Sequence, residues 1–161
     1  MPTLSDLIDI AVSDPKWTAF VPDYVPRIAG AVQAACDVLG RAPRAELSIA
    51  LMSDCQVRTL NRDYRGQDKP TNVLSFPATG PAYDDGYILG DIALARETVA
   101  KQAQNKGISA GEHLTHLIIH GYLHLSGYDH DTDEAANIME GLETKAMTHL
   151  GLANPYEENY V

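Results

Sequence analysis

The chain has 161 residues, is 45% hydrophobic and carries a formal net charge of -10 at pH 7. This length predicts one domain spanning residues 1–161, with a sizeable core. The start of the chain has neither a basic segment nor a long apolar run, and its two cysteines form no C-x-x-C pair. We therefore expect a cytoplasmic protein with reduced thiols, without a signal peptide or membrane anchor.

The acidic total argues against nucleic acid as a partner. Basic residues gather between positions 58 and 69, however, and a locally positive RNA groove is compatible with them.

Hydrophobic periodicity predicts an alternation of strands and helices. Apolar and polar residues alternate in the segments that we interpret as strands, whereas apolar residues recur at helical spacing in the others. The predicted elements are, in chain order, strand 7–12, helix 24–39, strand 45–52, helix 54–64, strand 72–76, strand 87–94, helix 96–104, helix 110–126 and helix 134–150. This order predicts an α+β fold, a small mixed sheet of about four strands packed with helices.

Local signals mark the boundaries of these elements. Gly40 ends the first long helix, and the segments 66–70 and 78–86 are rich in turn residues and predict loops. Ser109, with Glu112 three residues later, predicts a capping box at the start of helix 110–126. The pair Gly90-Asp91 interrupts the fourth predicted strand.

Three histidines between residues 120 and 130 carry the main chemical signal. His120 and His124 are four residues apart, so they lie above one another on one face of a helix. Gly127 can end that helix with a positive φ and let the chain turn back, which brings His130 towards the other two. The spacing predicts a three-histidine metal site on a helix and the following turn. His116, one turn earlier, is interpreted as an ordinary residue of the same helix.

Three imidazoles leave the fourth ligand position of a metal ion open, which is the pattern of catalytic zinc sites. Such an ion lowers the pKa of its bound water to about 7 or polarises a phosphoryl or carbonyl oxygen. Zinc peptidases add a glutamate directly after the first histidine as general base, but Gly121 stands there. This absence argues against a peptidase. Nickel and copper also suit an all-imidazole site.

Four further side chains are candidates for the same site. Arg65 lies where a helix passes into a loop, and its guanidinium suits phosphate, so it is our candidate for a catalytic residue. These residues alone fit an ordinary solvated surface arginine better. Asp129 could orient a metal-binding histidine or could be an ordinary turn residue. Asp91 could line the cleft or belong to a strand bulge, and Ser75 is a cleft hydroxyl or a structural one.

The motif His120-Gly-x-Leu-His-Leu-x-Gly-Tyr-Asp-His130 resembles the signature of the YbeY family of bacterial rRNA-maturation endoribonucleases. Further similarity lies in residues 60–77, which include Tyr64-Arg65 and Pro70-Thr-Asn-Val-Leu-Ser-Phe-Pro77. Residues 89–92 and the stretch from 139 to 151 also fit. The resemblance extends from about residue 45 to 153.

The resemblance implies one Zn²⁺ on His120, His124 and His130, with a functional arginine at Arg65. It implies cleavage of single-stranded RNA, maturation of the 3′ end of 16S rRNA and a part in ribosome quality control. The implied partners are small-subunit rRNA, the small ribosomal subunit and its assembly factors, and no membrane. Two alternatives remain open: a non-catalytic, metal-stabilised ribosome-assembly factor and, less favoured, a metzincin-like peptidase. Whether water or the ribose 2′-hydroxyl attacks the phosphate is also open, because no general base is identifiable.

Overall fold

The computed structural model describes residues 3–43, 45–81 and 86–156. Its strands are β1 (Ile8–Val12), β2 (Glu46–Met52), β3 (Val73–Pro77) and β4 (Ile88–Ala95). Its helices are α1 (Leu4–Leu7), α2 (Trp17–Phe20), α3 (Tyr24–Leu39), α4 (Asp54–Arg65), α6 (Arg96–Lys106), α7 (Ala110–Leu125) and α8 (Asp133–His149).

The strands form one mixed sheet in the order β1-β2-β4-β3. β1 pairs in parallel with β2, and β2 pairs in parallel with β4. β3 lies at the edge, antiparallel to β4, with Ser75 opposite Ile92. The predicted α+β fold with a small mixed sheet is therefore confirmed.

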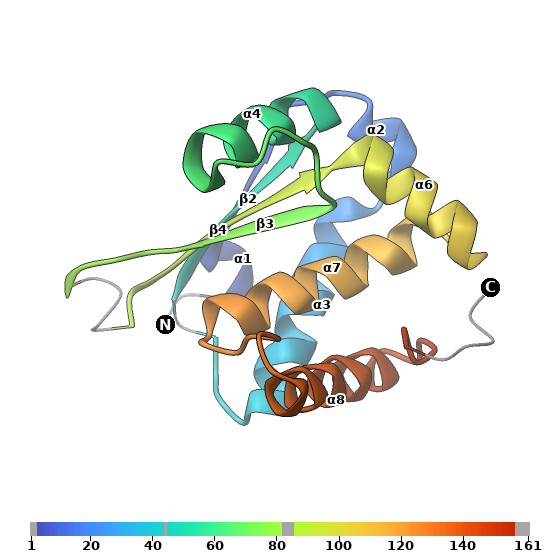
Figure 1. Cartoon of the computed structure of the whole chain (residues 1–161). Helices are drawn as coiled ribbons and strands as arrows, with labels where there is room; N and C mark the ends of the chain where they lie inside the picture. The colour runs from blue at the N-terminus through green and yellow to red at the C-terminus, as the bar shows by residue number, and fades with distance from the viewer. Residues whose placement is uncertain (1–2, 44, 82–85, 157–161) are drawn as a thin grey trace.

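Helices cover both faces of the sheet, as Figure 1 shows: α4 lies over one face, and α7 lies under the other with α3 and α8 beyond it. The large hydrophobic core fills the α7 side, where Ile92, Ile118 and Leu123 are fully buried. A smaller cluster of Val57, Leu74, Ala93 and Ala95 fills the α4 side. Since side chains alternate along a strand, neighbouring residues of β3 and β4 belong to different faces. α7 thus lies between the sheet and α8, with neighbours on most sides.

Most predicted elements agree with the structure, and the caps explain why. The helix expected at 24–39 has those bounds, and Gly40 follows it with a φ of 68°. Ser109 Oγ accepts a hydrogen bond from Glu112 N at the start of α7, and Thr132 Oγ accepts one from Ala135 N at the start of α8. These side chains satisfy backbone N–H groups that the first helical turn leaves unpaired.

Two short helices were not predicted, and the bounds of each strand differ from the prediction by one residue. α1 and α2 have four residues each, too few for a periodic pattern, and α1 includes Leu7, which we expected in the first strand. β4 is continuous, and the expected break is a bulge: Glu46 pairs with Ile88 while Leu47 pairs with Gly90, whose φ is 148°. Residues 82–85 of the expected loop lie outside the described residues. In the described part of the chain, no helix is both long and apolar enough to cross a membrane.

Candidate active site

The burial pattern of α7 singles out two histidines. From His113 to Leu125 every residue of this helix is buried except His120 and His124, which are partly exposed. A helix that is apolar on nearly all sides is a core helix. His120 and His124, which are one turn apart, are therefore the positions at which this part of α7 meets solvent. His113 and His116, by contrast, are buried polar residues of the core.

His130 joins these two histidines from the loop between α7 and α8. Gly127 has a φ of 102°, a conformation that favours glycine, and the chain reverses there. The ring of His130 lies 5.6 Å from that of His120 and 6.2 Å from that of His124, measured between centroids. The rings of His120 and His124 are 6.4 Å apart and almost parallel. The fold therefore brings together the three imidazoles that the sequence singled out.

The three rings lie close together, but their nitrogen atoms do not surround one point. Among residues 3–43, 45–81 and 86–156, no group of three His, Cys, Asp or Glu side chains is arranged to hold a metal ion as it stands. The three-histidine metal site accordingly stays a prediction. The donor set fits such an ion: three imidazoles within 6.4 Å of one another on a helix and its following turn.

A buried carboxylate behind the histidines is the main residue that sequence reasoning missed. Glu143, on α8, is 1% exposed, and its Oε1 lies 2.6 Å from His116 Nε2 and 3.3 Å from His120 Nδ1. Tyr156 Oη donates to the same oxygen at 2.8 Å. Burial alone raises the pKa of Glu143, but the hydrogen bonds from His116 and His120 outweigh it and lower the pKa to about 2. The signal for it in the sequence is an acidic residue among Met139, Ala146 and Met147 on the buried face of α8.

Glu143 determines which nitrogen His120 can offer to a ligand. A carboxylate that accepts from Nδ1–H fixes the tautomer and leaves Nε2 as the free lone pair. The surroundings of the neighbouring His124 favour its neutral form. Its pKa is lowered first by burial and then by the charges of His120, His130 and Arg65, while the backbone of Tyr128 opposes the shift. Metal binding requires the neutral form of imidazole.

Gly121, between the two histidines, faces the sheet. A Cβ atom at this position would lie 2.9 Å from Ile92 Cδ1 and 3.1 Å from Ser75 Oγ. The position that carries the general base in H-E-x-x-H peptidases therefore points away from the histidines and has no room for a side chain. This geometry explains the missing glutamate and weakens the peptidase alternative further.

Arg65 is held against the edge strand next to α7. α4 ends there because Gly66 takes a φ of 68°, and the side chain turns to β3. Arg65 Nη2 donates to the Ser75 carbonyl oxygen at 2.7 Å, and its Cζ lies 5.5 Å from the centre of the Phe76 ring. Its charge contributes to the lowered pKa of His124. The guanidinium is thus fixed within electrostatic reach of the histidines.

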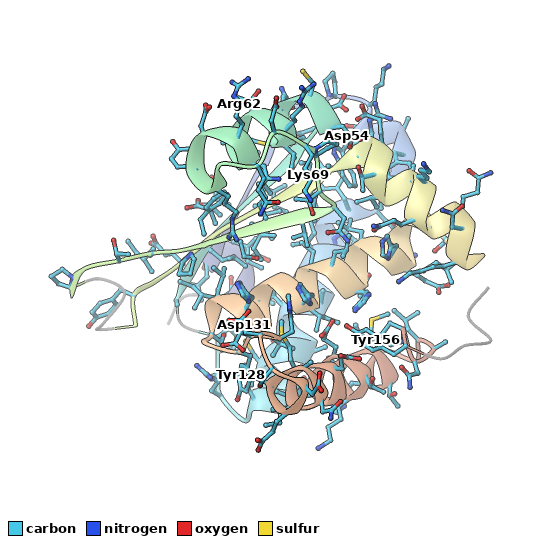
Figure 2. The ribbon with its side chains drawn as sticks, in the orientation of Figure 1. Asp54, Arg62, Lys69, Tyr128, Asp131 and Tyr156 are labelled. Atoms are coloured by element: carbon cyan, nitrogen blue, oxygen red, sulfur yellow. The ribbon has the colours of Figure 1, made fainter. Side chains whose placement is uncertain are left out.

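The basic cluster between residues 58 and 69 is only partly available to an anion. Arg58 forms a bidentate pair with Asp68, and Arg62 pairs with Asp63. Among the described residues, no carboxylate pairs with Arg65 or Lys69, and these two line a cavity of about 350 Å³. Figure 2 shows Lys69 in the loop that follows α4. The positive charge in this region therefore belongs mainly to Arg65 and Lys69.

The other candidate residues lie at different distances from this centre. Ser75, on β3, is buried next to Gly121, and its backbone carbonyl accepts a hydrogen bond from Arg65. Asp129 is half-buried in the loop with His130, and its Oδ1 accepts from Asp131 N at 3.2 Å. Figure 2 shows Tyr128 and Asp131 in this loop. Asp91 lines a cavity of about 550 Å³ with residues of the α4 face, on the side of the sheet away from α7. The fold brings Ser75 and Asp129 near the histidines and leaves Asp91 apart.

The fold and site define an α+β protein with convergent histidines on its central helix and an arginine fixed beside them. A solution structure of a Thermotoga maritima protein shares the fold, with a TM-score of 0.54 and 24% identity over 94% of this chain and 99% of that one. A sequence profile described as "Endoribonuclease YbeY" matches residues 13–151. The chain belongs to the YbeY family.

Relatives in three bacteria carry the same description, endoribonuclease YbeY. The Sphingopyxis alaskensis protein is 51% identical over 84% of this chain and 89% of its own. The Rhodospirillum rubrum protein is 47% identical over 88% of this chain and 77% of its own. The Azorhizobium caulinodans protein is 44% identical over 92% and 95%. The chain is therefore a member of a family of RNA-cleaving enzymes along nearly its whole length.

Proposed function

We propose that this protein is a metal-dependent endoribonuclease that cleaves single-stranded RNA and acts on the 3′ end of 16S rRNA during ribosome maturation and quality control. The small ribosomal subunit and its assembly factors are its proposed partners, and the cytoplasm its proposed location. The observation that carries this proposal is the convergence of His120, His124 and His130 next to a fixed Arg65.

The histidines would hold one Zn²⁺, with nickel or copper as alternatives. This ion would supply a Lewis acid beside the scissile phosphate. Glu143 supports the assignment, because it orients His120 through Nδ1 and leaves Nε2 for a ligand. The lowered pKa of His124 keeps its imidazole neutral, as a ligand must be.

Arg65 is proposed to bind the scissile phosphate. One guanidinium nitrogen is used to anchor the side chain on Ser75, and the other N–H groups of the planar fork can donate to phosphate oxygens. A guanidinium that is already fixed loses little conformational entropy when it binds. Arg65 would therefore position and neutralise the phosphate between β3 and the histidines.

The test is cleavage of a single-stranded RNA that carries the 3′ end of precursor 16S rRNA, with metal content measured in each preparation. We expect the wild type to cleave this RNA. The variants Arg65→Glu and His124→Ala should each lose at least about a hundredfold in cleavage rate, as when one donor that stabilises charge is removed. Arg62→Glu is the matched control, since Arg62 lies one turn earlier on α4 and pairs with Asp63. Cleavage at equal rates by all variants would mean a contaminating nuclease and would favour the assembly-factor alternative.

The same RNA tests the strand preference and the attacking group. Annealing a complementary strand over the cleavage site should abolish cutting if single strands are the substrate. A single 2′-deoxy nucleotide at the cleavage site should block cleavage if the ribose hydroxyl attacks. If water attacks, the deoxy substrate should still be cleaved. Turnover of peptides by the wild type, absent in His124→Ala, would instead support the peptidase alternative.

A further inference from the structure

A cavity of about 270 Å³ lies beside the three histidines and has His120 in its wall. Its walls come from α6, the start of β3, α7 and the segment after α8. The polar residues that line it include Asn72, Gln102, Asn105, Lys106, His120 and Tyr156. Only His120 among them belongs to the predicted active site. Since the His120 imidazole forms part of both, the cavity is within reach of a nucleotide next to a phosphate bound at the histidines.

The hydrogen-bonding groups of the cavity are mainly amides. Gln102 Oε1 accepts from Asn72 Nδ2 at 3.0 Å and lies 2.7 Å from His113 Nε2, whose pKa is lowered to about 3 chiefly by burial. His113 is therefore neutral and donates to this oxygen. Both hydrogen bonds use the carbonyl oxygen of the Gln102 side chain, so its NH₂ group remains to donate to a ligand. The exposed Asn105 adds a second amide with one acceptor and two donors.

The charge of the cavity suits a nucleobase better than a bare phosphate. Lys106 is the one lysine or arginine among the described residues that line it, and burial lowers the pKa of this ammonium while the Glu143 charge opposes the shift. One cation with a carboxylate in electrostatic reach gives little net attraction for a dianion. Base edges, in contrast, carry the mixed acceptors and donors that amides match.

The cavity also offers a ring for stacking. Tyr156 is 43% exposed, and its ring meets that of His116 at 90° with 5.5 Å between centroids. Its hydroxyl is fixed on Glu143. Figure 2 shows Tyr156 at the far end of α8 from the loop that carries Tyr128 and Asp131. Unpaired RNA bases are commonly bound by aromatic stacking together with hydrogen bonds to their edges.

We propose that this cavity holds one nucleobase of the RNA strand, that of the nucleotide next to the scissile phosphate. Gln102, Asn105 and Lys106 contact its edge, and Tyr156 stacks on its face. This inference rests on the proposed RNA substrate, and it adds a base-binding subsite to the metal-and-arginine centre.

The test uses RNA substrates in which a single abasic ribonucleotide replaces each position around the cleavage site in turn. Wild type should lose at least about tenfold in cleavage rate at one flanking position, the lower bound for the loss of one hydrogen bond and a stack. Asn105→Ala should be about fivefold slower on intact RNA and respond much less to the abasic position. Gln104→Ala is the matched control, an exposed amide on the same helix that does not line the cavity, and should behave as wild type.

Equal cleavage of all abasic substrates by wild type would overturn the base subsite and leave the nuclease proposal standing. If wild type does not cleave RNA at all, the nuclease proposal fails, and the cavity is tested by NMR. Side-chain amide signals of Gln102 and Asn105 should shift with ribonucleoside 5′-monophosphates and not with ribose 5-phosphate. Shifts of the same size with ribose 5-phosphate would mean a phosphate site and would overturn the proposal, as would the absence of any shift.

Discussion

His120 Nδ1 lies 3.3 Å from Glu143 Oε1, so a carboxylate on α8 determines the orientation of an imidazole on α7. The same oxygen meets His116 Nε2 and the hydroxyl of Tyr156. Glu143, on α8, is thereby hydrogen-bonded to α7 and to the segment after α8. Its charge is buried, and its hydrogen-bond partners compensate for the lost hydration.

Replacing Glu143 with glutamine should weaken metal binding about 10- to 100-fold, because the amide cannot accept as strongly from His120 and the ring loses its fixed tautomer. Zinc affinity measured by competition with a chelating dye checks this. Glu134→Gln, an exposed change in the first turn of α8, should leave the affinity unaltered. Wild-type affinity in a folded Glu143→Gln protein would show that the carboxylate is only structural.

Tyr156→Phe should lower the free energy of unfolding by about 1.5–3 kcal/mol, because it removes one hydrogen bond to a buried, ionised carboxylate. Urea unfolding of the single variants Tyr156→Phe and Glu143→Gln and of the double variant measures the coupling. We expect the two effects to be non-additive. Strict additivity would mean that this hydrogen bond contributes nothing to stability.

Gly121→Ala should destabilise the protein by about 1–3 kcal/mol, because the added methyl overlaps Ile92 and Ser75 and pushes α7 away from the sheet. Gly141→Ala on α8 is the control, since nothing lies within 4 Å of a Cβ there. That change should be neutral or stabilise by up to about 1 kcal/mol. Equal melting temperatures for the two variants would contradict the close approach of α7 and β4.

His113 should make the fold sensitive to mild acid. The unfolded chain binds a proton at this residue near pH 6.5, whereas the folded protein binds it only near pH 3. This histidine therefore contributes full stability above pH 6.5, and the contribution is lost as the pH falls towards 3. The loss amounts to about 2 kcal/mol at pH 5.

Unfolding by urea at pH 7, 6 and 5 tests this prediction. His113→Gln should show a shallower loss of stability than wild type, while His149→Gln, at an exposed position at the end of α8, should follow wild type. The range from pH 6.5 to 5 avoids the titration of Glu143, which falls between about 4.5 and 2. A His113→Gln protein with the wild-type slope would show that folding does not lower the pKa of His113.

The sequence by itself determined the features that depend on neighbours along the chain. Periodicity and capping residues predicted the bounds of α3 and the start of α7, because helical spacing and N-caps are local. The spacing of His120, His124 and Gly127 likewise predicted two stacked rings and the turn that returns His130 to them. α1 and α2 are too short to leave such a pattern.

Only the tertiary structure decided which distant residues meet these histidines. Glu143 is 23 positions from His120 in the sequence. In the sequence it looks like any other charged residue of α8, and only the packing of α7 on α8 buries it. Arg65 reaches the site because β3, the edge strand, offers it the Ser75 carbonyl, and Asp91 is turned away because side chains alternate across β4. Sheet order and helix packing are long-range contacts, so local sequence patterns cannot specify them.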